Sequence, residues 1–395
     1  MSKALTPDVL VLGLGAMGSA TALHLARCGA RVIGVDQVSP PHAFGSTHGE
    51  TRITRVATGE GADYVPLAQR SHFLWRQIER ETGAQLLTQC GGLLIAREPG
   101  LSPMHEQRDF LGATISNAER FNVPHEILTA GEVAKRYPQF ALTGEERAYF
   151  EPGAGYLDPE ACVAAQLQLA RECGAVLRTN ASVRSIHMEG QQAVATLDDT
   201  TIKPGRLVVC AGAWLPPLLA MLKCPAAITN TLVIRRQVLH WFAPERTLAP
   251  ASNYEAAHFP IFIWHWGGTQ ADVFYGFPAS ANGVKVATEQ MHDATTAAAV
   301  MREVEQHESE AMYAMHVRGR LRGVTAHCVQ AKTCLYTNAP HAKFLIGSPP
   351  GFGNVIAVSA CSGHGFKHSA AIGEAVAAYA TTNVLPAVLA PFAWG

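Results

Sequence analysis

Three glycines near the start of the chain, Gly13, Gly15 and Gly18, have the spacing G-x-G-x-x-G. In such a pattern the first glycine makes a tight turn, the second lets the backbone approach a pyrophosphate, and the third permits close packing of a helix on a strand. Asp36 ends the next apolar segment, where a carboxylate accepts hydrogen bonds from ribose hydroxyls. The pattern favours dinucleotide binding; the alternative is a glycine-rich turn followed by an incidental aspartate.

The segments around these glycines have the order strand, turn, helix, strand. Val9–Leu12 is a short apolar run, Ser19–Cys28 has apolar residues at helical spacing, and Gly29 ends that helix. Arg31–Val35 is the second expected strand. This order is a βαβ unit, in which the N-terminus of the helix faces the phosphates.

The glycine pattern does not by itself distinguish NAD from FAD. Two features favour FAD: the pattern lies at the N-terminal end, and a second glycine-rich segment, Ser362–Lys367, follows much later. FAD is long and spans more protein than NAD does. Two alternatives are kept, an NAD(P)-dependent dehydrogenase and a nucleotide-responsive binding module without turnover.

The remaining chain predicts a mixture of helices and strands. Helices are expected at Tyr64–Glu81, from Thr129 to near Pro138, from Asp158 to Arg171, at Ala294–Glu308 and at Ser369–Thr381. Strands are expected within 225–290 and at Gly91–Ala96, Ala175–Ser185, Ala193–Leu197, Arg206–Ala211, Phe344–Gly347 and Val355–Ser359. The fold class is therefore α/β (α+β mixed), with a Rossmann-like FAD-binding βαβ domain (1–90, 149–224 and 328–395) and an inserted β-rich substrate domain (91–148 and 225–327).

Bulk composition excludes several classes of function. The 395 residues carry 31 basic and 32 acidic side chains, so no net field favours nucleic acid or an anionic membrane as partner. The first residues show no signal peptide and no membrane-spanning run, which predicts a cytoplasmic location. The nine cysteines contain no CxxC pair and the histidines form no metal-ligand cluster, so neither a disulfide framework nor a metal is expected. We expect a monomer.

Seven motifs make the chain resemble a known family. They are GLGAMG at 13–18, PPHAFGSTHGETRITR at 40–55, GEGADYVPL at 59–67, YGFP at 275–278, Gly283 with Lys285, CLYT at 334–337 and SGHGFK at 362–367. With these motifs in order over nearly its whole length, the chain resembles the monomeric sarcosine oxidase family, which includes N-methyltryptophan and pipecolate oxidases. The resemblance implies oxidation of a secondary amino acid, with sarcosine, dioxygen and water giving glycine, formaldehyde and hydrogen peroxide. A bulkier or cyclic imino acid (pipecolate, proline or N-methyltryptophan) is the alternative substrate.

The resemblance implies that Cys334 carries FAD covalently, through a thioether to the 8α-methyl carbon of the flavin. A thiolate attacks that electron-poor position, and nearby cations are expected to favour the thiolate. A buried strand cysteine is the alternative interpretation.

The resemblance also assigns charged residues to the reaction. Arg55 and Lys367 match the family's clamp for the substrate carboxylate, which an arginine holds bidentately while a lysine adds a point charge. Lys285 matches the residue that activates dioxygen, because a fixed cation stabilises a developing anion, and Arg52 is expected to tune the flavin. The alternatives are solvated surface cations and, for Lys285, an edge-strand lysine.

The remaining implied residues lie around the same ring. The expected cofactor contacts are Gly13, Gly15, Ala16, Met17, Gly18, Asp36, Thr51, Cys334, Gly363, His364, Gly365 and Lys367, and His48, Tyr275 and Tyr336 are expected beside the flavin or in the substrate pocket. The match departs from the sarcosine oxidases at two positions, where Glu289 replaces a pocket histidine and Ile263, followed by Trp264–Trp266, replaces a pocket methionine. A pocket carboxylate would attract a cationic amine and repel a second carboxylate.

Overall fold

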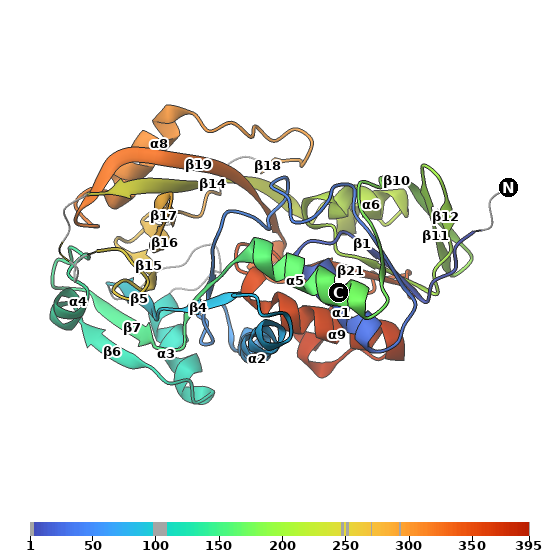
Figure 1. The fold of residues 1–395 in the computed structure, drawn as a ribbon, viewed down its shortest axis with the longest axis horizontal. Coiled ribbons are helices and arrows are strands. Elements are labelled where there is room, and N and C mark those ends of the chain that lie inside the picture. Colours follow the sequence, from blue (N-terminus) through green and yellow to red (C-terminus); the bar gives the residue numbers. More distant parts are fainter. Residues whose placement is uncertain are drawn as a thin grey trace.

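The computed structural model describes residues 4–97, 109–245, 249, 253–269, 271–291 and 294–394. Two large sheets, with helices packed against one of them, form the framework of the described structure (Figure 1). Among the described helices, none has both the length and the apolar character that crossing a bilayer requires. The α/β expectation is confirmed.

The first sheet is built from segments far apart in the sequence. Its strand order is β20 (Leu345–Gly347), β21 (Val355–Ser359), β13 (Arg206–Val209), β1 (Val9–Leu12), β2 (Val32–Val35) and β9 (Val176–Arg178). All neighbours are parallel except the edge pair β20–β21. Because the central strands are buried on both faces, they are almost entirely apolar, as parallel strands covered by helices must be.

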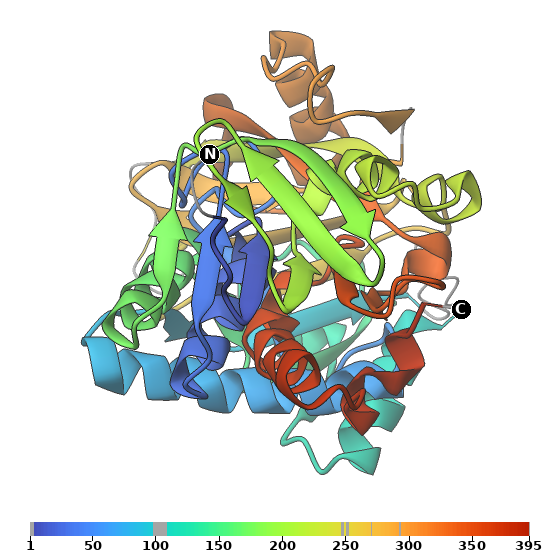
Figure 2. The same ribbon diagram turned by 90° about the vertical axis from the view of Figure 1, so that its right-hand side faces the viewer.

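Helices α1 (Ala16–Arg27), α2 (Val65–Thr82), α5 (Pro159–Glu172) and α9 (Ser369–Thr382) pack together beside this sheet, and Figure 2 shows α9 beside the N-terminal strands. A Cβ on Gly373 of α9 would lie 2.3 Å from the Cβ of Ala20 on α1, so a glycine is needed for this close approach. Ser19 of α1 donates to Gln166 of α5 over 2.8 Å. The C-terminal helix thus fixes the first βαβ unit in place.

The second sheet has nine strands and forms the other half of the molecule (Figure 1). Its order is β18 (Ala294–Thr295), β14 (Val233–Pro244), β17 (Gly283–Ala287), β16 (Val273–Ser280), β15 (Ile261–His265), β5 (Gly92–Ala96), β7 (Arg147–Glu151) and β6 (Glu126–Thr129), with β19 (Val324–Asn338) paired to β14. One face is covered by aromatic side chains, including Phe140, Phe242, Phe262, Trp264 and Phe274. The opposite face is free to carry polar groups.

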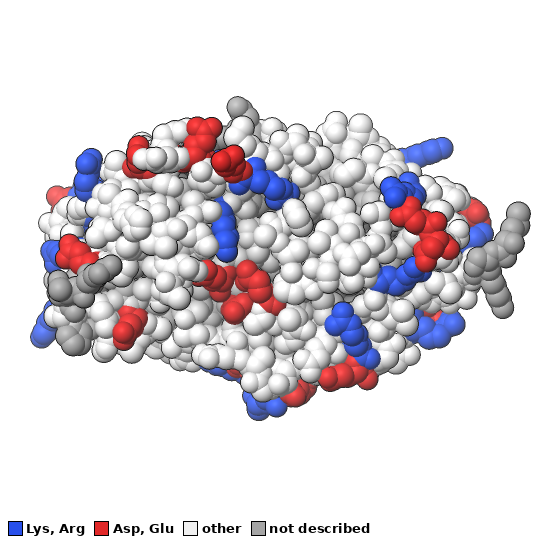
Figure 3. Space-filling model, turned by 45° about the horizontal axis from the view of Figure 1, so that its top comes forward, with Lys and Arg blue, Asp and Glu red and all other residues white. Residues whose placement is uncertain are grey.

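Short elements complete the described structure. Two three-stranded sheets consist of β3 (Arg52–Thr54), β8 (Gly155–Leu157) and β4 (Leu87–Gln89), and of β10 (Val183–Glu189), β11 (Gln192–Leu197) and β12 (Thr201–Ile202). The short helices are α3 (Phe110–Arg120), α4 (Ala130–Arg136), α6 (Leu215–Met221), α7 (Ala226–Thr229) and α8 (Gln306–Met312). On the face in Figure 3, acidic and basic side chains lie in scattered clusters of both signs, in keeping with the small net charge.

Predictions based on local signals are confirmed. Thr129 and Glu132 form the capping box of α4, and Asp158 accepts a hydrogen bond at the start of α5 with Pro159 in the first turn. Helix α2 covers the amphipathic segment predicted at 64–81 and ends at Gly83, which has φ +71°. Such signals act within one turn, so the surrounding fold does not change them.

Two predicted elements are wrong. Residues 294–308 do not form one helix, because strand β18 takes Ala294–Thr295 and α8 begins only at Gln306. Arg236 donates to the carbonyls of Met301 and Glu303, which an intact helix would use internally. The strand expected at 175–185 is divided into β9 and β10, which belong to different sheets.

Candidate active site

The glycine-rich turn between β1 and α1 has the geometry of a phosphate cradle. Gly13 has φ +85°, and a Cβ there would lie 2.6 Å from the carbonyl oxygen of Cys210. A Cβ on Gly18 would lie 1.7 Å from the carbonyl oxygen of Gly13, whereas one on Gly15 would meet only Thr47 at 3.6 Å. Gly15 is the N-cap of α1 and no side chain caps that helix. The first amides of α1 are therefore available to an anion.

Asp36 lies at the end of β2, beside this turn. Its carboxylate accepts hydrogen bonds from the backbone amides of Leu14 (2.8 Å) and Val38 (3.0 Å). The side chain is buried among protein atoms and lines the same cavity as the glycines. The carboxylate thus holds the turn in shape and presents an acceptor where a ribose would lie.

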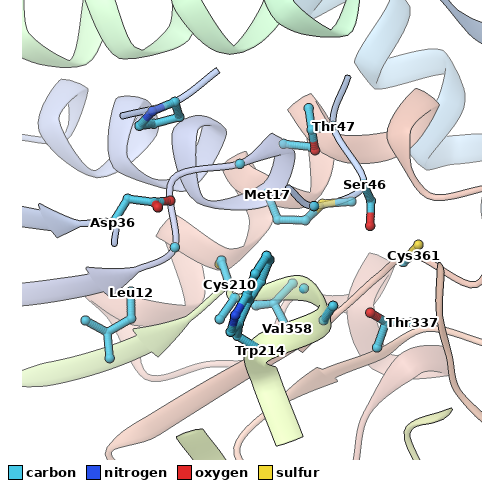
Figure 4. Close-up of a pocket in the computed structure, with 18 of the residues that line it drawn as sticks. Leu12, Met17, Asp36, Ser46, Thr47, Cys210, Trp214, Thr337, Val358 and Cys361 are labelled. Carbon is cyan, nitrogen blue, oxygen red and sulfur yellow. The ribbon is translucent and has the colours of Figure 1, made fainter. Parts of the chain in front are cut away.

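A cavity of about 310 Å³ extends from this turn toward the centre of the molecule. Figure 4 shows Asp36 toward one side of it and Thr337 and Cys361 toward the other. Residues from 12–52, 181–221 and 336–366 contribute most of the lining. An elongated cavity with a phosphate cradle and a ribose acceptor fits a dinucleotide, and the residues present therefore fit FAD.

A second, smaller cavity of about 100 Å³ adjoins the first. Four residues line both cavities: Arg52, Tyr336, Gly363 and Phe366. Those four residues lie where the reactive end of an extended cofactor would meet a substrate. Ile263 and Tyr275, which lie opposite each other on β15 and β16, line the smaller cavity as well.

The two predicted clamp residues converge on one carboxylate of the protein itself. Arg55 donates to Glu60 over 2.9 Å, and Lys367 donates to the other oxygen of Glu60 over 3.0 Å. The three side chains are about 5% exposed, so each charge depends on its neighbours rather than on water. Burial lowers the pKa of Lys367 and Glu60 opposes that shift. This arrangement demonstrates that the two cations can hold a carboxylate between them.

Lys285 lies on β17 with its amine directed at the loop before β3. Its Nζ atom donates to the carbonyls of Gly49 (2.6 Å) and Thr51 (2.8 Å) and to the hydroxyl of Thr51 (3.0 Å). It also lies 5.3 Å from the ring centre of Trp241 and 4.7 Å from that of Phe277. Burial lowers the pKa of Lys285 well below its usual value, while these acceptors hold the amine at the cavity wall.

Arg52 connects Lys285's loop to Cys334. It donates to the carbonyls of Thr51 (2.8 Å) and Ser46 (2.6 Å), and its guanidinium lies 3.6 Å from the sulfur of Cys334. Cys334 is 1% exposed on β19. Burial raises the pKa of this thiol; Arg52 and Lys285 lower it, as expected of nearby cations, but burial is the larger effect.

The tyrosines face one another in the smaller cavity. The hydroxyl groups of Tyr275 and Tyr336 are 3.2 Å apart. Burial raises the pKa of Tyr275 to about 12 and that of Tyr336 well above its usual value, so both hydroxyls keep their protons at neutral pH. His48 lies close to Arg52 and Lys285, and burial together with these cations lowers its pKa to about 3. His48 is therefore a neutral imidazole.

The segment Gly363–Gly365 contributes backbone rather than side chains. Gly363 has φ +78° and lines both cavities, and a Cβ on Gly365 would lie 1.6 Å from the carbonyl oxygen of Ala360. The imidazole of His364 contacts the carbonyl oxygen of Ala342 at 3.0 Å and stacks on Phe344. The glycines thus let the backbone approach a bound ring closely.

Glu289 lies two residues after the end of β17 and lines the smaller cavity with Lys367 and Glu60. Burial raises the pKa of Glu289 to about 8, the charge of Glu60 adds to that shift, and Lys367 opposes it. On β15, His265 lines the same cavity, whereas Trp264 packs into the aromatic core. Of the segment 264–266, only His265 is among the residues that line this cavity.

The structure brings the predicted residues together around the two cavities. The residues that line them are Gly13, Gly15, Ala16, Met17, Asp36, Thr51, Arg52, Arg55, Ile263, Tyr275, Lys285, Glu289, Tyr336, Gly363, His364, Gly365 and Lys367. Gly18 lies beneath the turn, and Cys334 and His48 lie next to Arg52.

Sequence reasoning missed two acids. Glu60 belongs to the segment GEGADYVPL at 59–67, and its position five residues after Arg55 was the only sequence feature that pointed to their ion pair. Glu160, in the first turn of α5, accepts from the amide of Gly49 at 2.6 Å and so holds the loop whose carbonyls bind Lys285. It had no local signal, because 111 residues separate the two partners.

Comparison with known proteins gives concordant findings. The family model described as FAD dependent oxidoreductase matches residues 8–379. The chain is 36% identical to monomeric sarcosine oxidase of Streptomyces avermitilis, over 96% of this chain and 94% of that protein. It is 31% identical to N-methyl-L-tryptophan oxidase of Yersinia pestis, over 98% of both chains.

Solved structures share the fold. The open form of NikD, an amino acid oxidase essential for nikkomycin biosynthesis, has a TM-score of 0.82 at 21% identity and covers 98% of this chain and 97% of its own. L-Proline dehydrogenase from P. horikoshii has a TM-score of 0.73 at 20% identity and covers 97% of this chain and 96% of its own. At these identities the likeness concerns the fold alone.

Proposed function

This chain belongs to the FAD-dependent oxidoreductase family, and from that premise we propose that it is an oxidase of small secondary amino acids, with sarcosine as the preferred substrate. Sarcosine, dioxygen and water would yield glycine, formaldehyde and hydrogen peroxide. The names of the relatives, a sarcosine oxidase and an N-methyl-L-tryptophan oxidase, support oxidation at a carbon attached to nitrogen.

One observation carries the proposal. Arg55 and Lys367 converge on the carboxylate of Glu60 from two sides, at 2.9 and 3.0 Å, in a cavity that adjoins the dinucleotide cavity. Among the described residues, Arg55 also has a buried Nε–H without a hydrogen-bond partner, so the pair has a donor left for the carboxylate of an amino acid beside Glu60. An amino acid gripped there places its nitrogen and the adjoining carbon next to Tyr336 and Gly363, which line both cavities.

When bound, FAD supplies the redox chemistry, accepting a hydride equivalent from the carbon next to nitrogen and passing two electrons to dioxygen. The protein contributes orientation and charge. Arg55 and Lys367 hold the carboxylate, and the walls formed by Tyr275, Tyr336 and Ile263 limit the substrate's size. Three oxygen acceptors hold the amine of Lys285 in the wall of the smaller cavity, and in its protonated form it would stabilise the negative charge that develops on dioxygen.

We further propose that the cofactor is bonded to Cys334. The sulfur lies 3.6 Å from Arg52, a residue that lines both cavities, and 3.7 Å from the carbonyl oxygen of Ser46 on the cofactor side. The raised pKa of this thiol makes the thiolate rare in the protein without cofactor. Arg52, which lowers the pKa of this thiol, would stabilise the thiolate that attachment requires.

A panel of amines with peroxide detection tests the proposed function. Sarcosine, N-methylalanine, proline, pipecolate and N-methyltryptophan would be compared by kcat/KM, with dimethylamine as a substrate that lacks the carboxylate. We expect sarcosine to give the highest value and dimethylamine the lowest. The cavity of about 100 Å³ favours the small substrates over the bulkier alternatives. If none of these amines gave hydrogen peroxide, the proposal would be overturned.

A further inference from the structure

Glu289 has no role in the proposed function, although it occupies the substrate cavity. On β17, Lys285 lines this cavity and Ala287 packs with Tyr275 and Tyr336, and Glu289 lies two residues beyond the end of the strand. Lys285 and Glu289 thus line the same cavity, and Glu289 is close enough to Lys367 for the two charges to interact. An amino acid in the cavity would therefore meet both the amine of Lys285 and a titratable acid.

The oxidation requires a proton acceptor. A secondary amine in water at neutral pH is an ammonium ion, since alkyl ammonium groups have a pKa of about 10. The nitrogen lone pair must be free to form the carbon–nitrogen double bond as the hydride equivalent leaves carbon. One N–H bond must therefore break first, and its proton must go to a group in the cavity or to water.

We propose that Glu289 accepts this proton, an inference that rests on the proposed function. The ammonium N–H bond breaks, an O–H bond forms on the Glu289 carboxylate, and the electron pair stays on nitrogen. The carbon–hydrogen electron pair then passes to the cofactor and from there to dioxygen, so no additional oxidant is needed. The Glu289 proton returns to solvent after the product leaves.

Size brings the substrate nitrogen close to Glu289. The nitrogen of an amino acid lies only about 2.5 Å from its own carboxylate carbon, given ordinary bond lengths and angles. A carboxylate held by Arg55 and Lys367 therefore places the nitrogen in the space that the clamp shares with Glu289. Tyr275 and Tyr336 enclose this space too, since the charge of Glu289 acts on the ionisation of both.

Five other groups on the lining are poorer acceptors. Lys285 and Lys367 donate their protons to oxygen atoms of the protein, and the raised pKa values of Tyr275 and Tyr336 keep those hydroxyls protonated. The carboxylate of Glu60 is already occupied by its ion pairs with Arg55 and Lys367.

The pKa of Glu289 also suits a proton acceptor. Its pKa of about 8 is closer to that of an ammonium group than an ordinary carboxyl's is, and a general base works best with a pKa near the working pH. The groups that face it and influence its titration are Glu60, Lys367, Tyr275 and Tyr336, and Arg55, His265 and His364 line the same cavity. An incoming ammonium ion favours the ionised form further.

The pH profile of kcat/KM for sarcosine tests the inference in the holoenzyme. For the wild type, kcat/KM should rise through pH ~8 as Glu289 ionises. It should fall above pH ~10 as the free substrate loses its own proton. Glu289→Gln should use only the neutral amine, which is about 1% of the total at pH 8, so its activity should fall roughly 100-fold there. That variant should recover as the pH rises through 10.

Two control variants and one substrate analogue distinguish loss of the proton acceptor from other effects of the substitution. Glu289→Asp retains a carboxylate and should retain the rise near pH 8. Glu310→Gln, at an exposed position of α8 that accepts from Gln306, should leave the wild-type profile unchanged. Methoxyacetate, which has an ether oxygen in place of the amine, should bind wild type and Glu289→Gln alike in a titration of the flavin absorbance.

Wild-type kcat/KM and an unchanged pH profile in Glu289→Gln would overturn the inference while leaving the proposed function in place. A wild-type enzyme that oxidises no amine of the panel would overturn both.

Discussion

Replacing Arg55 by methionine isolates the carboxylate clamp. Methionine keeps much of the length and apolar character of the arginine stem and removes the guanidinium, which donates to Glu60 over 2.9 Å and to the carbonyl oxygen of Ala57 over 2.5 Å. The side chain is 5% exposed, so water does not replace the lost donor. Truncating one partner of a buried, hydrogen-bonded charge pair costs about 2–5 kcal/mol.

That range corresponds to a loss of binding of roughly 30- to 5000-fold, since about 1.4 kcal/mol is a factor of ten. We expect Arg55→Met to raise the dissociation constant of methoxyacetate and the KM for sarcosine within this range. Oxidation of dimethylamine, which lacks the carboxylate, should change little. The dissociation constant is measured by anaerobic titration of the oxidised holoenzyme, and KM by initial rates of peroxide formation.

Two controls separate binding from folding. Arg184→Met removes an exposed arginine that pairs with Asp198 and should leave both constants unchanged. In Arg55→Met, Glu60 keeps its ion pair with Lys367, so the variant should still fold, and thermal unfolding of the purified variant measures any loss of stability separately from the loss of affinity. A dissociation constant within twofold of wild type in Arg55→Met would refute the clamp.

The remaining predictions concern oxygen, the tether and the cradle. Lys285→Met should slow reoxidation of the reduced enzyme by dioxygen far more than its reduction by sarcosine in stopped-flow experiments, and equal slowing of the two half-reactions would contradict the assigned role. Cys334→Ala should release yellow cofactor into the supernatant on acid precipitation, whereas the wild type should keep it with the protein; identical behaviour would exclude the tether. Gly18→Ala should lower the flavin-to-protein absorbance ratio severalfold, because its Cβ would lie 1.7 Å from the carbonyl oxygen of Gly13, while Gly131→Ala, which meets no atom within 4 Å, should leave the ratio unchanged.

Local signals predicted the elements that depend on a single turn or strand. The βαβ unit at 9–35, the capping box at Thr129 and the start of α5 at Asp158 all follow from contacts within a few residues. The segment 294–308 failed for a tertiary reason. Its helix-forming composition is overridden by Arg236, which binds two of its carbonyl groups, and by the pairing of β18 with β14.

The candidate site shows the same division. Motifs identified Arg55, Lys285, Cys334 and Lys367 as residue types with a plausible chemistry, because each lies in a short segment of distinctive spacing. The contact of Lys367 with Glu60 joins positions 307 residues apart. Nothing in the sequence of either segment indicates that the two lie together, so the ion pairs of Glu60 with the predicted clamp were missed.

The sequence by itself determined which backbone positions must be glycine, where the first helices begin and which side chains carry charge, because these depend on steric limits and hydrogen bonds within a few residues. The tertiary structure alone decided how those charges behave. The thiol of Cys334 has a raised pKa despite its arginine neighbour, and Glu289 titrates near 8 instead of as an ordinary carboxyl. Ionisation depends on burial and on charges brought from distant segments, and these exist only once the chain has folded.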